Sequence, residues 1–144
     1  MKILIFLAIT SCLLTISLCQ SEKTTYDPEF EQTFKVKHLN EGDGVTFGKP
    51  GTQVTVHYTG TFEDGRKFDS SKDRNQPFSF TLKRGQVIQC WDEVVSRMTV
   101  GEMIYVVCPS RLAYGERGAG GIIPPNTDIA FEIEMLSVGK KEDL

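Results

Sequence analysis

Two stretches of the chain alternate between apolar and polar side chains. Residues 53–58 and residues 129–135 each place a large apolar side chain at every second position, which is the period of a half-buried β-strand. The run over residues 103–108 is apolar throughout and contains three β-branched residues, a composition that suits a central strand. The pattern therefore predicts a sheet built from several strands.

A helical period occurs only over residues 87–100. From Trp91 onward, apolar side chains recur three, four and seven residues along the chain, so they would line one face of a helix. Gly101 is placed to end this helix. One short helix beside several strands must cover the apolar face of the sheet, so we expect an α+β domain. The segment 109–126 is a long Gly- and Pro-rich loop, and loops of this length are usually functional.

The amino-terminal residues 1–19 have the composition of a secretory signal peptide. Lys2 precedes an uncharged apolar stretch, and small side chains stand near position 19 as a cleavage region requires. The apolar stretch is shorter than the roughly 20 residues that a membrane helix needs, although a retained anchor is the alternative. Residues 20–32 are polar and acidic, so we expect a flexible leader followed by one domain over residues 33–140.

The last four residues, 141–144, read Lys-Glu-Asp-Leu. They are similar to the retrieval signal of the endoplasmic reticulum with its two acids transposed. The alternative is a charged tail without an address. Together with a signal peptide, the sequence favours the lumen of the endoplasmic reticulum, and secretion is the second interpretation.

Charge and residue content exclude several classes of function. The formal net charge is −3, so there is no basic excess to bind nucleic acid. The chain has two histidines, and neither they nor the cysteines have the short spacing of metal ligands. No phosphate-binding or dinucleotide-binding motif is present. We expect no metal, no cofactor, no membrane contact after signal removal, and a monomer.

Cys90 and Cys108 are the two cysteines that remain after signal removal. Cys108 shares the inward parity of its strand, and the helix containing Cys90 should pack on that sheet. The two can therefore form a disulfide, which an oxidising compartment permits. Two alternatives stay open: Cys90 as a small apolar side chain, and Cys90 as a reactive thiol near the start of a helix.

Five short motifs occur in order along the chain: VHYTG at 56–60, EDGRKFDSS at 63–71, QVIQCW at 86–91, AYG at 113–115 and IIPPNT at 122–127. Together they resemble the FKBP family of peptidyl-prolyl cis-trans isomerases, the receptors of the macrolides tacrolimus and rapamycin. The resemblance covers residues 33–138. It implies a twisted antiparallel sheet of five or six strands, wrapped around one short α-helix with a hydrophobic pocket between them.

The resemblance also implies which residues form the pocket. Trp91 is similar to the pocket floor, Phe68 and Asp69 to the pair beside the substrate carbonyl, and Arg74 to the arginine that pairs with the aspartate. The other implied binding residues are the walls Tyr58, Phe78 and Phe131, the rim residues Val87 and Ile88, and the loop residues Tyr114 and Ile123. The chain departs from the family pattern at Cys90, where many members have glycine, and at Gln86, where an acid is common.

The implied reaction needs no nucleophile, because rotation about an X–Pro bond breaks no covalent bond and is opposed by amide resonance, about 18–20 kcal/mol. A dry pocket favours the twisted, less polar amide. We expect the Tyr114 hydroxyl and a backbone N–H near Ile88 to donate hydrogen bonds. The expected partners are proline-containing client polypeptides. The alternatives are a non-catalytic proline-binding immunophilin or chaperone module, and a thiol enzyme using Cys90.

Overall fold

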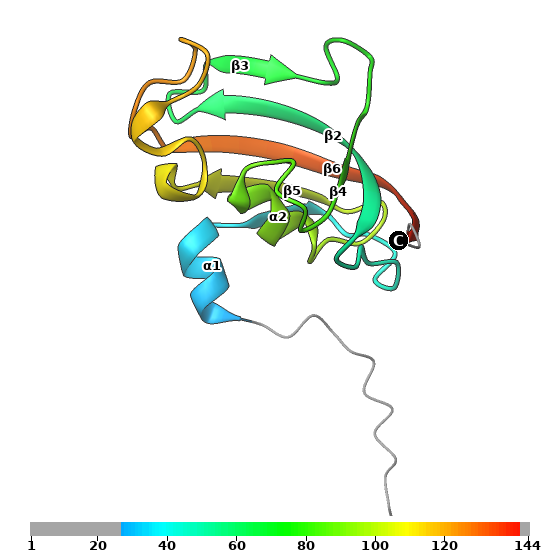
Figure 1. Ribbon diagram of the computed structural model, residues 1–144. Helices are drawn as coiled ribbons and strands as arrows, with labels where there is room; N and C mark the ends of the chain where they lie inside the picture. The colour runs from blue at the N-terminus through cyan, green and yellow to red at the C-terminus, as the bar shows by residue number, and fades with distance from the viewer. Residues whose placement is uncertain (1–26, 142–144) are drawn as a thin grey trace, which may run out of the picture.

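The structure, a computed structural model, describes residues 27–141 (Figure 1). The elements in chain order are α1 (Pro28–Phe34), β1 (Lys37–Asn40), β2 (Thr52–Phe62), β3 (Lys67–Ser70), β4 (Phe78–Thr81), α2 (Gln89–Val95), β5 (Met103–Cys108), the 3-10 turns η1 (Ser110–Leu112) and η2 (Gly115–Arg117), and β6 (Ile129–Lys141). The predicted signal peptide at 1–19 and residues 142–144 of the predicted retrieval signal lie outside the described residues.

The six described strands form one antiparallel sheet in the order β1-β5-β6-β2-β3, with β4 also paired to β2. Figure 1 shows α2 lying across one face of this sheet. The predicted α+β class, an antiparallel sheet around a short helix, is confirmed. The long strand β2 pairs with β6 along most of its length, from Thr52 to Phe62, and this pair forms the centre of the sheet.

Only one face of the sheet is covered, and the burial of β5 shows it. Although β5 is apolar throughout, Ile104, Val106 and Cys108 are buried while Tyr105 is exposed. The strand therefore alternates like a half-buried strand, because α2 covers its inner side alone. The core lies between α2 and the inner faces of β2, β5 and β6.

Helix α2 is shorter than the predicted 87–100. It ends at Val95, where the Ser96 hydroxyl donates to the carbonyl oxygen of Glu93 at 2.8 Å. The chain then continues through tight turns that still bury Met98. The helical spacing of apolar residues in the sequence therefore continues past the end of the helix. Gly101 has a φ of +84° and serves the turn into β5 rather than the end of α2.

Helix α1 corrects the predicted leader, because residues 28–32 belong to the folded domain. Asp27 Oδ1 accepts a hydrogen bond from Phe30 N at 3.2 Å, as an N-cap does. The rings of Phe30 and Phe34 lie 4.8 Å apart, and Phe34 is buried in the core. Arg97, just beyond α2, stacks its guanidinium on Phe30 at 3.9 Å. The two phenylalanines, together with Arg97, which also pairs with Asp27 at 3.2 Å, bind this polar segment to the domain.

The described chain between residues 27 and 141 contains no helix with the length and apolar character needed to span a membrane.

Candidate active site

A cavity of about 170 Å³ opens between α2 and the inner face of the sheet. Its lining is mainly aromatic and aliphatic with a single carboxylate, which is typical of a ligand-binding cleft. The lining residues are Tyr58, Phe68, Asp69, Phe78, Gln86, Val87, Ile88, Trp91, Tyr114 and Phe131. The structure thus brings together nine of the residues that the resemblance assigned to a pocket, from six separate segments of the chain.

Trp91 forms the base of this cavity and is only 4% exposed. The rings of Tyr58 and Phe131 meet it edge-on, with centroids 5.0 and 5.2 Å away. Such contacts match the negative ring face with a positive ring edge. Within the described residues, Trp91 Nε1 is buried without a hydrogen-bond partner. The indole is therefore held by packing, and no hydrogen bond fixes its orientation.

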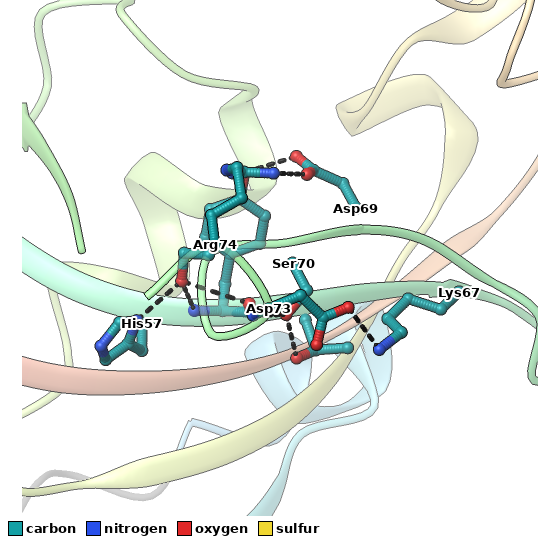
Figure 2. Close-up of polar contacts among 9 residues, drawn as sticks. His57, Lys67, Asp69, Ser70, Asp73 and Arg74 are labelled. Carbon is teal, nitrogen blue, oxygen red and sulfur yellow. Dashed lines mark hydrogen bonds and ion pairs between the residues drawn. The ribbon is translucent and has the colours of Figure 1, made fainter. Parts of the chain in front are cut away.

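Tyr58, by contrast, is held by a polar network at the edge of the cavity. Its hydroxyl donates to Asp69 Oδ2 and accepts a hydrogen bond from Arg74 Nη2 at 3.1 Å. Arg74 Nη1 also donates to Asp69 Oδ1, and Figure 2 shows the guanidinium directed at this carboxylate. The three side chains form a closed triangle that fixes the Tyr58 ring against Trp91.

The network shifts the titration of its members. Partial burial alone would raise the pKa of Asp69, but the hydrogen bonds from Tyr58 and Arg74, together with the charge of Arg74, lower it below the usual 3.8. Burial and the hydrogen bond to Asp69 raise the pKa of the Tyr58 hydroxyl. At neutral pH the site therefore holds an ionised carboxylate and a protonated phenol.

The segment after β3 places Arg74 by turning back onto β2. The buried Ser71 hydroxyl accepts a hydrogen bond from Tyr58 N at 2.8 Å and lies 2.9 Å from His57 Nδ1. The Ser70 hydroxyl accepts from Asp73 N at 3.3 Å, and these contacts appear in Figure 2. His57, on the outer face of the sheet, thus supports the turn and lies outside the cavity lining.

Gly60 was not predicted as a site residue, yet it determines how closely two walls approach. A Cβ atom at this position would lie 2.6 Å from Phe68 Cζ and 3.0 Å from Phe131 Cε1. The two rings are in edge-to-face contact, 5.8 Å between centroids. A glycine inside a strand often marks such a close approach, so the sequence did contain a signal for this role.

The rim of the cavity carries hydrogen-bond donors that have no acceptor within the described residues. Ile88 has extended dihedral angles just before α2, and its N–H has no acceptor among residues 27–141. Tyr114 is 39% exposed, and burial together with the charge of Asp69 raises the pKa of its hydroxyl, which keeps the hydroxyl protonated at neutral pH. Gln86 also lines the cavity, and its Oε1 accepts from Thr81 N at 2.8 Å.

Ile123 is the one predicted binding residue that does not line the cavity. It pairs with Ala119, since Ala119 N donates to the Ile123 carbonyl at 2.9 Å and Ile123 N to the Ala119 carbonyl at 3.0 Å. This small hairpin turns Ile123 into the core, where it is 6% exposed, and turns Ile122 outward. The sequence alone did not show this local pairing.

Cys90 and Cys108 are joined by a disulfide, with Cα atoms 5.8 Å apart, and both side chains are fully buried. A reactive thiol at Cys90 needs solvent access and a free sulfur, so the alternative of a thiol enzyme is wrong for this state. Among residues 27–141, no group of three or more His, Cys, Asp or Glu side chains is arranged to hold a metal ion.

Comparison with known proteins agrees with this geometry. A family profile described as FKBP-type peptidyl-prolyl cis-trans isomerase matches residues 44–136. The chain is 54% identical to the peptidyl-prolyl cis-trans isomerase Fkbp12 of Drosophila melanogaster over 104 residues, which are 72% of this chain and 96% of that protein. It is 49% identical to the peptidyl-prolyl cis-trans isomerase FKBP1A of Xenopus laevis over 102 residues, 71% of this chain and 94% of that protein.

A third relative, FK506-binding protein 1 of Saccharomyces cerevisiae, is 47% identical over 108 residues, 75% of this chain and 95% of that protein. The matched regions cover nearly the full length of each relative. The family match over residues 44–136 includes every segment that lines the cavity. The chain belongs to the FKBP-type family and is a peptidyl-prolyl cis-trans isomerase.

Proposed function

We propose that the cavity over Trp91 binds the proline ring of an X–Pro segment and accelerates rotation about its peptide bond, in client chains that fold in the secretory pathway. The observation that carries the proposal is the aromatic cavity itself, which holds one ionised carboxylate at its edge and free donors on its rim. Its volume of about 170 Å³ suits a prolyl ring and its neighbouring peptide group.

The cavity promotes rotation about the X–Pro bond because it excludes water. A planar amide carries partial charge on oxygen, and water stabilises that charge, whereas the twisted amide has lost much of it. A water-poor aromatic cleft therefore favours the twisted form relative to the planar form. Shortening an uncatalysed time of about 10–100 s to milliseconds requires about 5–6 kcal/mol, at 1.36 kcal/mol for each factor of ten.

The rim donors supply the directional part of this stabilisation. The Ile88 N–H has no acceptor within the described chain and lies at the cavity edge, so it is free to bind a carbonyl oxygen of the substrate backbone. The Tyr114 hydroxyl, which also lines the cavity, is the second donor. Asp69 and Phe68 lie beside the twisting bond, and Arg74 holds Asp69 in place.

Substitutions at the edge of the cavity test this assignment. Asp69→Val and Phe68→Ala should each lower kcat/KM for an X-Pro peptide about tenfold, equivalent to about 1.4 kcal/mol, in a protease-coupled isomerisation assay. Asp64→Val is the matched control, since Asp64 is an exposed turn residue that pairs with Arg66. Cooperative unfolding of all three variants with unchanged turnover in the first two would refute the pocket assignment.

The same cavity should bind macrolides, since the yeast relative is named as a binding protein of FK506, the macrolide tacrolimus. Rapamycin or tacrolimus should inhibit turnover in competition with the peptide, and Phe68→Ala should weaken the inhibition. Binding of rapamycin without any acceleration of isomerisation would instead support the non-catalytic immunophilin module.

We also propose that the protein acts in the lumen of the endoplasmic reticulum. Three features support this location: the composition of residues 1–19, the terminal Lys-Glu-Asp-Leu sequence, and a buried disulfide, which forms and persists in oxidising compartments. Slow X–Pro isomerisation limits folding of secretory chains, so an isomerase has a role there.

Expression in cultured cells tests the location. The full-length protein should lose its first residues and be retained in the endoplasmic reticulum, whereas deletion of residues 141–144 should release it into the medium. Release of both forms would leave secretion as the correct location, and a cytosolic protein with an uncleaved amino terminus would overturn the proposal.

A further inference from the structure

The disulfide joins the helix that carries the floor of the cavity to the strand that precedes the loop of Tyr114. Cys90 lies in the first turn of α2, directly before Trp91, and Cys108 is the last residue of β5. Residues 109–114 then lead to Tyr114 on the cavity rim. The bond therefore connects the helix beneath the substrate to the point where the long loop leaves the sheet.

At the helix end of this connection, few polar contacts lie on the amino-terminal side of Trp91. Helix α2 has only seven residues, and its N-cap residue Ile88 makes no side-chain capping hydrogen bond. Trp91 Nε1 has no partner within the described residues, so no hydrogen bond of the indole resists a rotation of the ring. The height and tilt of the floor therefore depend on packing, on the covalent bond at Cys90, and on the hydrogen bond from Lys83 N to Asp92 Oδ1 at 2.9 Å.

The strand end of the connection is rigidly placed. All six residues of β5 pair with β6 in unbroken register, Cys108 with Ile129. The next segment is tied as well, because Ser110 N donates to Asp128 Oδ1 at 2.7 Å. The disulfide thus attaches the start of α2, which has no side-chain cap, to a strand that pairs with β6 in unbroken register.

We infer that the Cys90–Cys108 disulfide positions the Trp91 floor, so that the catalytic efficiency of the folded enzyme depends on whether this pair was oxidised. The inference rests on the proposed function of the cavity. Because both side chains are fully buried, a reductant cannot reach the bond in the native state. The redox conditions under which the chain folds therefore set the activity.

Formation of the bond is a two-electron oxidation. The two thiols lose two protons and two electrons to an external disulfide such as oxidised glutathione, which is reduced to two glutathione thiols. In an oxidising compartment this exchange occurs before the core closes. In a reducing one the chain folds with two buried thiols that leave α2 without its covalent attachment.

The test compares the same protein in two redox states. The purified protein is denatured and refolded either with reduced and oxidised glutathione or with dithiothreitol, and thiols are counted by mass spectrometry. Both forms are assayed well below their melting temperatures, for kcat and KM on an X-Pro peptide and for rapamycin affinity. We expect the dithiol form to have a kcat/KM lower by about three- to tenfold, with KM raised as well as kcat lowered, because the floor contacts the bound proline.

A merely stabilising disulfide gives a different result. In that case the dithiol form would melt at a lower temperature than the oxidised form, but the two forms would have equal kcat, KM and rapamycin affinity. That result would overturn the inference. Absence of turnover in both forms would instead refute the proposed function. Dithiothreitol added to the folded oxidised protein should release no thiols, and rapid release would contradict the claim that folding fixes the state.

Two variants separate positioning from loss of stability. The double variant Cys90→Ala/Cys108→Ala should show the same reduced kcat/KM under both refolding conditions. Phe34→Leu is the matched control, because Phe34 is buried where α1 meets the core and does not line the cavity. It should lower the melting temperature and leave kcat/KM unchanged, and an equal loss of activity in this control would overturn the inference.

Discussion

Tyr58 and Trp91 lie in edge-to-face contact, 5.0 Å apart, in the same cavity, yet they are held in opposite ways. Tyr58 is fixed by hydrogen bonds at its hydroxyl and by the bond from its N–H to Ser71. Trp91 has no hydrogen bond at its indole within the described chain. The Tyr58 ring therefore depends on the charge and proton state of its partners, while Trp91 depends on volume and packing. Changes in pH should act on the site through Tyr58, and changes in side-chain size through Trp91 and the walls that lack hydrogen bonds.

Removal of the floor is expected to have the largest effect. Trp91→Ala should lower kcat/KM about 100-fold or more, and loss of a buried aromatic side chain typically costs about 3–5 kcal/mol of unfolding free energy. Isomerisation kinetics and chemical denaturation measure the two quantities. Trp91→Phe keeps an aromatic floor, so it should fold stably and lose about tenfold, or about 1.4 kcal/mol. Full activity of the folded Phe variant would show that the size of the floor is unimportant.

Added volume at the wall should have the next largest effect. In Gly60→Ala the new methyl group would lie 2.6 Å from Phe68 Cζ, so the Phe68 ring must move, at a cost of about 1–3 kcal/mol. We expect kcat/KM to fall about tenfold with a smaller loss of melting temperature. Gly139→Ala in β6 is the control, because its nearest contact would be the Gln53 carbonyl oxygen at 3.2 Å, away from the cavity lining. Equal losses of kcat/KM in both variants would indicate a general effect on the sheet.

For the floor and the wall alike, the sequence predicted the residues but not how they pack. The aromatic residues of both stood in motifs that resemble a known family, so Tyr58 and Trp91 could be identified without coordinates. The close approach of Phe68 and Phe131 at Gly60 and the inward turn of Ile123 could not be predicted, because both depend on the three-dimensional path of the chain. The disulfide stayed one of several alternatives, since the 5.8 Å between Cys90 and Cys108 Cα atoms depends on where α2 meets β5.

The strands were predicted better than the helices for a physical reason. Alternation over residues 53–58 and 129–135 reflects a sheet covered on one face only, and burial follows it. Helix α1 was missed because two phenylalanines in a seven-residue polar segment give too short a period to recognise. The predicted extent of α2 was wrong at its end, because Met98 is buried by a turn and continues the apolar spacing without helical hydrogen bonds.

The smallest expected effect concerns the proton state of the wall. The pKa of Asp69 is lowered below its usual 3.8 by Tyr58 and Arg74, against the opposing effect of burial. A carboxyl with a lowered folded-state pKa stabilises the fold fully above the unfolded value and loses this contribution as pH falls through the folded value. Activity that depends on ionised Asp69 should therefore stay constant from neutral pH down to about pH 5, more than one unit above the unfolded value.

Arg74→Ala makes this dependence measurable. Without the guanidinium, Asp69 loses one hydrogen bond and a neighbouring positive charge, so its pKa should rise toward or above 3.8. The carbon-13 shift of the Asp69 carboxyl, followed by NMR, should then titrate at higher pH than in the unchanged protein, and kcat/KM should begin to fall at higher pH. Lys67→Ala removes a cation that pairs with Asp73 outside the cavity lining and should leave the Asp69 titration in place. The same titration in all three proteins would mean that Arg74 is not needed to lower the pKa of Asp69, and that the hydrogen bonds from Tyr58 and the Ser70 backbone N–H hold the carboxylate ionised.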